Sequence, residues 1–188
     1  MQEQGPGLGL KITPPGVFLW RIRYSAVSIA QRLVGVWRLV SFEVHAPGQP
    51  IRYPFGPDAV GLLIYDANGV MAGQLMRPGR STFASPTISR GSDTELVEAA
   101  TGYVAYAGTY SVNEVNDAEG VVTHHVTMSL FPNLVGTDQH RHMMIDGSRL
   151  ELRTPPENGR VMMLRWERYV SPHGPEISDR PISADHRD

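Results

Sequence analysis

The stretch LVGVWRLVSFEV, residues 33–44, decides the fold of this chain. Side chains alternate between the two faces of a strand, so Trp37 and Glu43 share one face and Phe42 lies on the other. The glycine at Gly35 lets the backbone turn sharply or be approached closely, and the tryptophan can then lie flat across the end of a core. The pattern predicts a first long strand whose tryptophan closes one end of the core.

Similar strand-length runs follow along the chain, separated by short turn signals. The sequence DANG at 66–69 is typical of a hairpin turn, and DG at 146–147 and NG at 158–159 give the same signal. Eight antiparallel strands with short links can close on themselves and leave room inside for one small ligand. We therefore predict an all-β protein, a single up-and-down antiparallel barrel of about eight strands. The strands are expected at residues 33–44, 60–65, 70–76, 104–112, 121–131, 137–145, 149–154 and 161–169.

Two short helices and two tails complete the predicted organisation. A helix is expected at 28–32, capped by a serine, and a second at 94–101 inside a long loop, placed across a mouth of the barrel. Residues 1–27 are predicted to form an arm that is flexible or covers the barrel as a lid, with residues 17–24 as its apolar part. The barrel domain is predicted at 28–170, followed by a loose, polar tail at 171–188.

The composition limits the classes of partner and chemistry. The net charge of −2 and the lack of a basic run argue against nucleic acid as a partner. The chain has no cysteine, which excludes disulfides, thiolate zinc sites and cysteine nucleophiles. No apolar run approaches the roughly 20 residues of a membrane span. We expect a cytoplasmic protein, a monomer or homodimer, with no membrane partner and no cofactor.

Four further blocks of the sequence are distinctive: YPFGPDAVGLLIYDANGVM (53–71), YVAYAGTYSV (103–112), HHVTMSLFPNLVGTDQHR (124–141) and LRWER (164–168). They resemble the lipocalin-like domain family of bacteria and fungi. Together with Trp37 the resemblance covers residues 33–170, and it implies a lipocalin-like barrel without specifying a reaction. In lipocalin-type barrels an arginine on the last strand stacks on the tryptophan of the first, which implies that Arg168 closes the barrel floor over Trp37.

Strand alternation predicts which polar side chains point inward. In the strand at 121–131, His124 shares a face with Val122 and Val126, so we expect this face to be the core side. In the strand at 137–145, Arg141 shares its face with Met143. The predicted catalytic or charge-stabilising residues are Glu43, Tyr106, Tyr110, His124 and Arg141. The predicted ligand-binding residues are Trp37, Tyr65, Met71, Tyr106, Tyr110, His124, Met128, Arg141, Met143 and Trp166.

Two interpretations of the inward charges remain open. Glu43 and Arg141 could neutralise each other in a structural pair, because a buried charge is costly without a partner. Alternatively, Arg141 and His124 could hold an oxygen of a ligand in a cavity that is otherwise apolar. A β-bulge after Trp37 would exchange the faces of Phe42 and Glu43 and remove the carboxylate from the interior.

The histidines allow a metal site as a further alternative. A hairpin centred near 132–133 would place His125 opposite His140, with His142 on the same face. That face is predicted to point outward and carries no carboxylate at a recognisable spacing, so we predict no metal.

The leading function is binding of a small amphipathic molecule, anionic or carrying a carbonyl, inside the barrel. The alternative is a cofactor-independent cyclase or isomerase of a polyketide-type or other natural-product pathway. Such an enzyme would fold a flexible substrate in the same cavity and stabilise developing charge on an oxygen.

Overall fold

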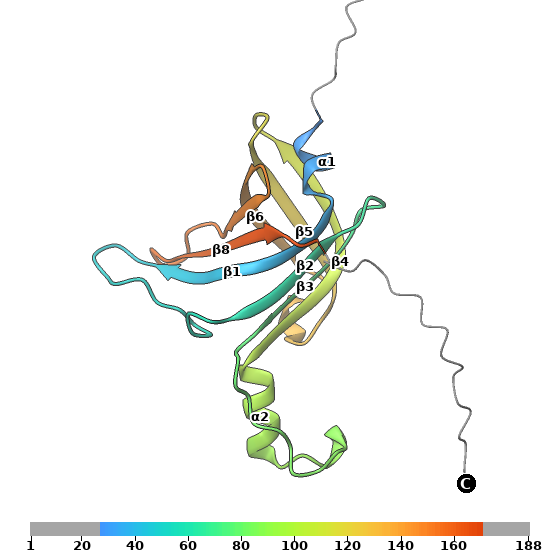
Figure 1. Cartoon of the computed structure of the whole chain (residues 1–188), viewed down its shortest axis with the longest axis vertical. Coiled ribbons are helices and arrows are strands. Elements are labelled where there is room, and N and C mark those ends of the chain that lie inside the picture. The colour runs from blue at the N-terminus through green and yellow to red at the C-terminus, as the bar shows by residue number, and fades with distance from the viewer. Residues whose placement is uncertain (1–26, 171–188) are drawn as a thin grey trace, which may run out of the picture.

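The computed structural model describes residues 27–170, which form a closed barrel of eight antiparallel strands in sequence order (Figure 1). The predicted up-and-down barrel is therefore confirmed. The predictions for the lid-forming arm and for the loose tail lie outside the described residues. The elements are α1 (Ile29–Leu33), β1 (Gly35–His45), β2 (Val60–Tyr65), β3 (Val70–Met76), α2 (Asp93–Thr101), β4 (Tyr103–Glu114), β5 (Glu119–Ser129), β6 (Asp138–Asp146), β7 (Arg149–Arg153) and β8 (Val161–Arg168), with short 3-10 turns at Ile88–Arg90 and Pro132–Leu134.

A bulge in β1 exchanges the two faces of that strand halfway along its length. Leu39 pairs with Trp166, but the next pair on the ladder is Ser41 with Arg165, so Val40 is an extra residue. An extra residue reverses the alternation beyond it. Phe42 consequently joins the core, and Glu43 lies on the outer face of the barrel.

Trp37 and Arg168 close one end of the barrel. The Trp37 side chain is completely buried, and its Nε1 donates a hydrogen bond of 2.9 Å to the carbonyl of Leu33. The guanidinium carbon of Arg168 lies 4.2 Å from the centroid of the Trp37 ring, and Nη1 donates to the carbonyl of Val34. Gly35 has a φ of +137°, a backbone conformation that side chains rarely adopt, and a Cβ there would also meet this guanidinium, which together explain the glycine. The predicted stacking of arginine on tryptophan is confirmed.

Helix α1 covers this closed end and is positioned by its cap. The side chain of Ser28 accepts a hydrogen bond from the backbone of Gln31, whose side chain bonds back to the backbone of Ser28. Ile29 and Leu33 are buried in the core beneath the helix. The opposite end of the barrel is therefore the end at which a ligand could enter.

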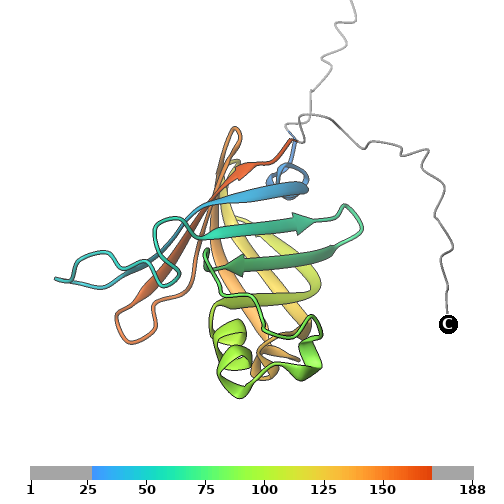
Figure 2. The same cartoon turned by 60° about the horizontal axis from the view of Figure 1, so that its bottom comes forward.

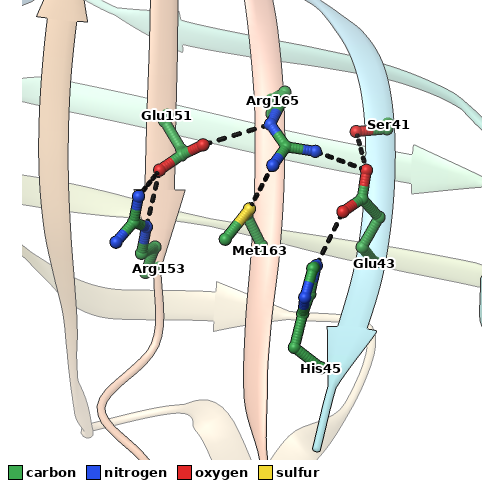
Figure 3. A network of polar contacts seen from close by, with 7 residues as sticks. All are labelled: Ser41, Glu43, His45, Glu151, Arg153, Met163 and Arg165. Carbon is green, nitrogen blue, oxygen red and sulfur yellow. Dashed lines mark hydrogen bonds and ion pairs between the residues drawn. The ribbon is translucent and has the colours of Figure 1, made fainter. Parts of the chain in front are cut away.

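On the outer face, an ion-pair network joins the first strand to the last two strands (Figure 3). Arg165 Nη1 donates to Glu43 Oε1 at 2.5 Å, and Arg165 Nε donates to Glu151 Oε2 at 3.1 Å. Glu43 also bonds to Ser41 at 2.8 Å and to His45 at 2.7 Å. Burial raises the pKa of Glu43, but these hydrogen bonds outweigh it and hold that pKa below its usual value.

We expect Glu43→Gln to lower the free energy of unfolding by about 1–3 kcal/mol, because the buried end of the network loses its charge. The contribution of Glu43 to stability is complete above the pKa that a glutamate has in the unfolded chain. It is lost as the pH falls through the lower pKa that Glu43 has in the folded chain. Urea unfolding at pH 7 measures the effect. The control is Glu167→Gln, which breaks the exposed pair with Arg38 and should cost less than about 1 kcal/mol. Equal losses in the two variants would contradict a stabilising role for the network.

Helix α2 lies in the connection between β3 and β4 and projects beyond the ends of these strands (Figures 1 and 2). Ser92 and Glu95 form a capping box at its start, as the sequence predicts. None of the residues of α2 is buried, and none lines the cavities described below. The expectation of a helix across the mouth is wrong, because α2 contacts the barrel chiefly at β4. Neither α1 nor α2, within residues 27–170, is long and apolar enough to cross a membrane.

Candidate functional site

The barrel encloses an inner cavity of about 220 Å³ in the half nearer the entrance. Most of its wall is aliphatic or aromatic, as is usual for sites that bind small organic molecules. Its polar residues come from the neighbouring strands β3, β4, β5 and β6, together with Thr154 just beyond β7. The lining residues are Phe42, Leu63, Gly73, Gln74, Leu75, Val104, Tyr106, His124, Leu134, Gln139, Arg141, Leu152, Thr154, Met162, Leu164 and Trp166.

His124 lies between two tyrosines at the inner end of this cavity. Its Nε2 is 2.7 Å from the hydroxyl of Tyr65, and its Nδ1 is 2.9 Å from the hydroxyl of Tyr106. Burial, aided by the nearby charge of Arg141, lowers the pKa of His124 to about 3. Burial also raises the pKa of both tyrosines above the ordinary value. The three side chains are therefore neutral near pH 7.

Arg141 supplies the positive charge of the cavity. Its Nη1 donates to the carbonyl of His140 at 2.7 Å, and its Nη2 lies 3.4 Å from Oε1 of Gln139. Within residues 27–170 it forms no salt bridge with a carboxylate. The predicted structural pair of Arg141 with Glu43 is therefore wrong, because Glu43 binds Arg165 on the outer face.

An outer vestibule of about 600 Å³ adjoins the inner cavity at the entrance. Arg141, Gln139, Thr154 and Met162 line both spaces, so Arg141 lies at the boundary between them. Arg52 and Arg160 add positive charge to the vestibule wall, and Asp138 and Glu157 add negative charge. The arrangement can hold an apolar ring inside and an oxygen atom near the guanidinium.

The structure brings four of the predicted site residues to the cavity wall: Tyr106, His124, Arg141 and Trp166. Five others lie elsewhere inside the barrel and do not line the cavity: Trp37, Tyr65, Met71, Tyr110 and Met143. Among these, Tyr65 still reaches the site through His124, and the hydroxyl of Tyr110 donates to the carbonyl of Asp66.

Two predicted site residues are on the outside of the barrel. Glu43 is displaced by the bulge at Val40. Met128 is 64% exposed, because a second bulge interrupts β5: Gly108 pairs with Val126 and Ala107 pairs with Met128, leaving Thr127 as an extra residue. Both corrections have the same physical reason, since one inserted residue reverses the faces of the rest of the strand.

Sequence reasoning missed several lining residues, which also belong to inward faces. Phe42 was hidden by the first bulge, whereas Gln139 could have been found from its position two residues before Arg141. Thr154 and Leu164 continue the inward faces of β7 and β8. Arg165, the true partner of Glu43, carries no sequence signal that distinguishes it from other surface arginines.

The three histidines of the metal alternative do not converge. His125 pairs with Asp138 on the ladder and bonds to it at 2.7 Å, while His140 lies opposite Thr123. The expected pairing of His125 with His140 is therefore wrong by two residues. Within residues 27–170, no three histidine, aspartate or glutamate side chains are grouped closely enough to hold a metal ion.

The chain is similar to a carrier protein over part of its length and matches a known domain family. The chain is 39% identical over 87 residues to the 4'-hydroxy-3'-methoxypropiophenone carrier protein of Aspergillus oryzae, an alignment that covers 45% of this chain and 78% of that protein. Two solved structures match more distantly: a redesigned β-barrel (12% identity, 75% of this chain and 95% of that one, TM-score 0.39) and a de novo designed fluorescence-activating β-barrel (14% identity, 76% and 99%, TM-score 0.38). The lipocalin-like domain family matches residues 34–169, and this chain belongs to that family.

Proposed function

We propose that this protein is a carrier that binds a small oxygenated aromatic molecule in the inner cavity. The observation that carries the proposal is a mostly apolar cavity of about 220 Å³ with the charge of Arg141 at its boundary. Sites for drug-sized ligands occupy about 300–1,000 Å³. The smaller volume here suits a ligand of about one substituted ring.

The relative in Aspergillus oryzae supports this class of ligand. The molecule named for that carrier has one aromatic ring with a ketone, a hydroxyl and a methoxy group. Its ring and alkyl carbons match the aliphatic and aromatic wall, and its oxygens match the hydrogen-bond donors of Arg141 and Tyr106. A ketone in the para position also delocalises the charge of a phenolate, and a phenolate would be stabilised by the guanidinium.

Binding is better supported than the cyclase or isomerase alternative. Proton abstraction next to a carbonyl needs a base whose pKa lies near the working pH. The pKa of His124 is lowered to about 3, and both its nitrogens already face tyrosine hydroxyls. With Glu43 on the outer face, no carboxylate lines the inner cavity among the described residues. The interior is therefore better suited to holding an oxygenated ligand than to removing a proton from it.

The test is isothermal titration of the full chain with 4'-hydroxy-3'-methoxypropiophenone, repeated on Arg141→Met. This change keeps most of the volume and removes the charge, so we expect affinity to fall about tenfold or more. Because Arg141 bonds to a carbonyl and an amide, the cost in stability should stay below about 1 kcal/mol. Thermal melting of the same sample measures that cost.

The matched control is Arg38→Met, which removes an exposed arginine on the outer face of β1. It should leave the affinity unchanged. Absence of binding by the wild-type chain would contradict the proposed ligand, and a strongly lowered melting temperature of Arg141→Met with unchanged affinity would assign Arg141 a structural role.

A further inference from the structure

The two tyrosines beside His124 are not equivalent. The side chain of Tyr65 is completely buried, and within residues 27–170 its hydroxyl has one hydrogen-bond partner, His124 Nε2. Tyr106 is only partly buried and lines the inner cavity. The imidazole must therefore accept the hydroxyl hydrogen of Tyr65. Tyr106, by contrast, also borders the cavity.

This difference determines which nitrogen of His124 carries the proton. A neutral imidazole has one donor and one acceptor nitrogen. If Nε2 carried the hydrogen, the hydroxyl hydrogen of Tyr65 would be buried without an acceptor, which is costly. Tyr65 therefore donates to Nε2, and the hydrogen of the imidazole is on Nδ1.

The consequence reaches the cavity through Tyr106. With a hydrogen on Nδ1, His124 donates to the oxygen of Tyr106 across 2.9 Å. The oxygen of Tyr106 then acts as the acceptor in this contact, and its own hydroxyl hydrogen remains available. Within the described residues no acceptor takes that hydrogen, and the Tyr106 side chain lies beside the cavity that this residue lines.

A second unused donor, the indole of Trp166, is enclosed within the wall. The indole Nε1 of Trp166 is buried, and no atom of the described residues accepts its hydrogen. Buried indole nitrogens normally have a partner. Nε1 itself has almost no accessible surface, so Trp166 contributes its ring to the cavity wall and is not counted as a donor to the ligand.

We propose that Tyr65, acting through His124, directs the hydroxyl hydrogen of Tyr106 into the inner cavity, and that this hydrogen selects ligands whose ring carries a hydrogen-bond-accepting oxygen, such as an aryl ketone. The inference rests on the proposed function and deepens it by naming the feature of the ligand that is recognised. Tyr65 is a positioning residue in this scheme, since it does not line the cavity.

The test compares two ligands that differ in one group. 4'-Hydroxy-3'-methoxypropiophenone carries the ketone, and 2-methoxy-4-propylphenol has a methylene group in its place. We expect the wild-type chain to bind the ketone about tenfold more tightly. Tyr106→Phe should reduce this preference at least about threefold, because it removes the donor. A change in apolar packing that affects both ligands equally leaves the ratio of their two affinities unchanged.

Tyr65→Phe is the decisive variant. It removes no atom from the cavity wall, yet it should reduce the preference for the ketone while leaving the affinity for the propylphenol nearly unchanged. Tyr169→Phe, at an exposed position beyond β8, is the control and should keep the wild-type ratio. A preference that survives Tyr65→Phe at its wild-type value would overturn the inference while leaving the carrier function intact.

Proton–nitrogen correlation spectra of the imidazole provide a second measurement that needs no ligand. We expect the signals of His124 to show a protonated Nδ1 and an unprotonated Nε2. A protonated Nε2 would overturn the inference. If neither ligand binds, the proposed ligand class is wrong, and these spectra alone decide whether Tyr65 orients His124.

Discussion

Replacing Trp37 by alanine is expected to lower the free energy of unfolding by about 3–5 kcal/mol. The side chain is completely buried at the closed end of the barrel, in contact with the guanidinium of Arg168 and bonded to the carbonyl of Leu33. Its loss leaves a large space beneath α1 and removes a cation–π contact worth about 1–2 kcal/mol when desolvated. Chemical unfolding of the full chain measures the loss.

The control for this prediction is Arg38→Ala, the neighbouring position on the outer face of β1, where the loss should be below about 1 kcal/mol. A loss below 1 kcal/mol for Trp37→Ala as well would mean that the closed end does not stabilise the fold. Ligand affinity should be retained in any folded Trp37→Ala protein, because Trp37 does not line the inner cavity.

The second large effect is a loss of stability in acid that originates at His124. Its pKa is about 3 in the folded chain and near 6.5 when unfolded, because burial disfavours the charged imidazole. Below pH 6.5 the unfolded state binds a proton that the folded state does not. The contribution of His124 is thus complete above pH 6.5 and decreases as the pH falls toward 3, by about 1.4 kcal/mol per pH unit and up to about 5 kcal/mol in total.

Urea unfolding between pH 7 and pH 5 measures this dependence before the carboxylates begin to titrate. His124→Gln should be less stable than the wild type at pH 7, but its stability should change much less over this interval. His140→Gln, at an exposed position on β6, is the control and should keep the wild-type slope. An unchanged slope in His124→Gln would show that the acid sensitivity comes from another group.

The sequence alone determined the architecture and the closed end of the barrel. Alternating side chains and hairpin turn residues predict strands wherever one face is buried, because the strand period is local and needs no tertiary information. Ser28 and Ser92 cap their helices through bonds to residues three positions away, so these helix starts are also local. The inward positions of His124 and Arg141 follow from the apolar neighbours on the same strand face.

The tertiary structure decided the composition of the site, for two physical reasons. The bulges at Val40 and Thr127 reverse the faces of β1 and β5, and each depends on how the neighbouring strand pairs, which the alternation within one strand does not encode. The hydrogen bonds of His124 to Tyr65 and Tyr106 join three strands, and the indole of Trp166, which has no acceptor within residues 27–170, is defined only by what surrounds it. Local periodicity assigns a side chain to a face, whereas the partners it meets there are set by the closure of the barrel.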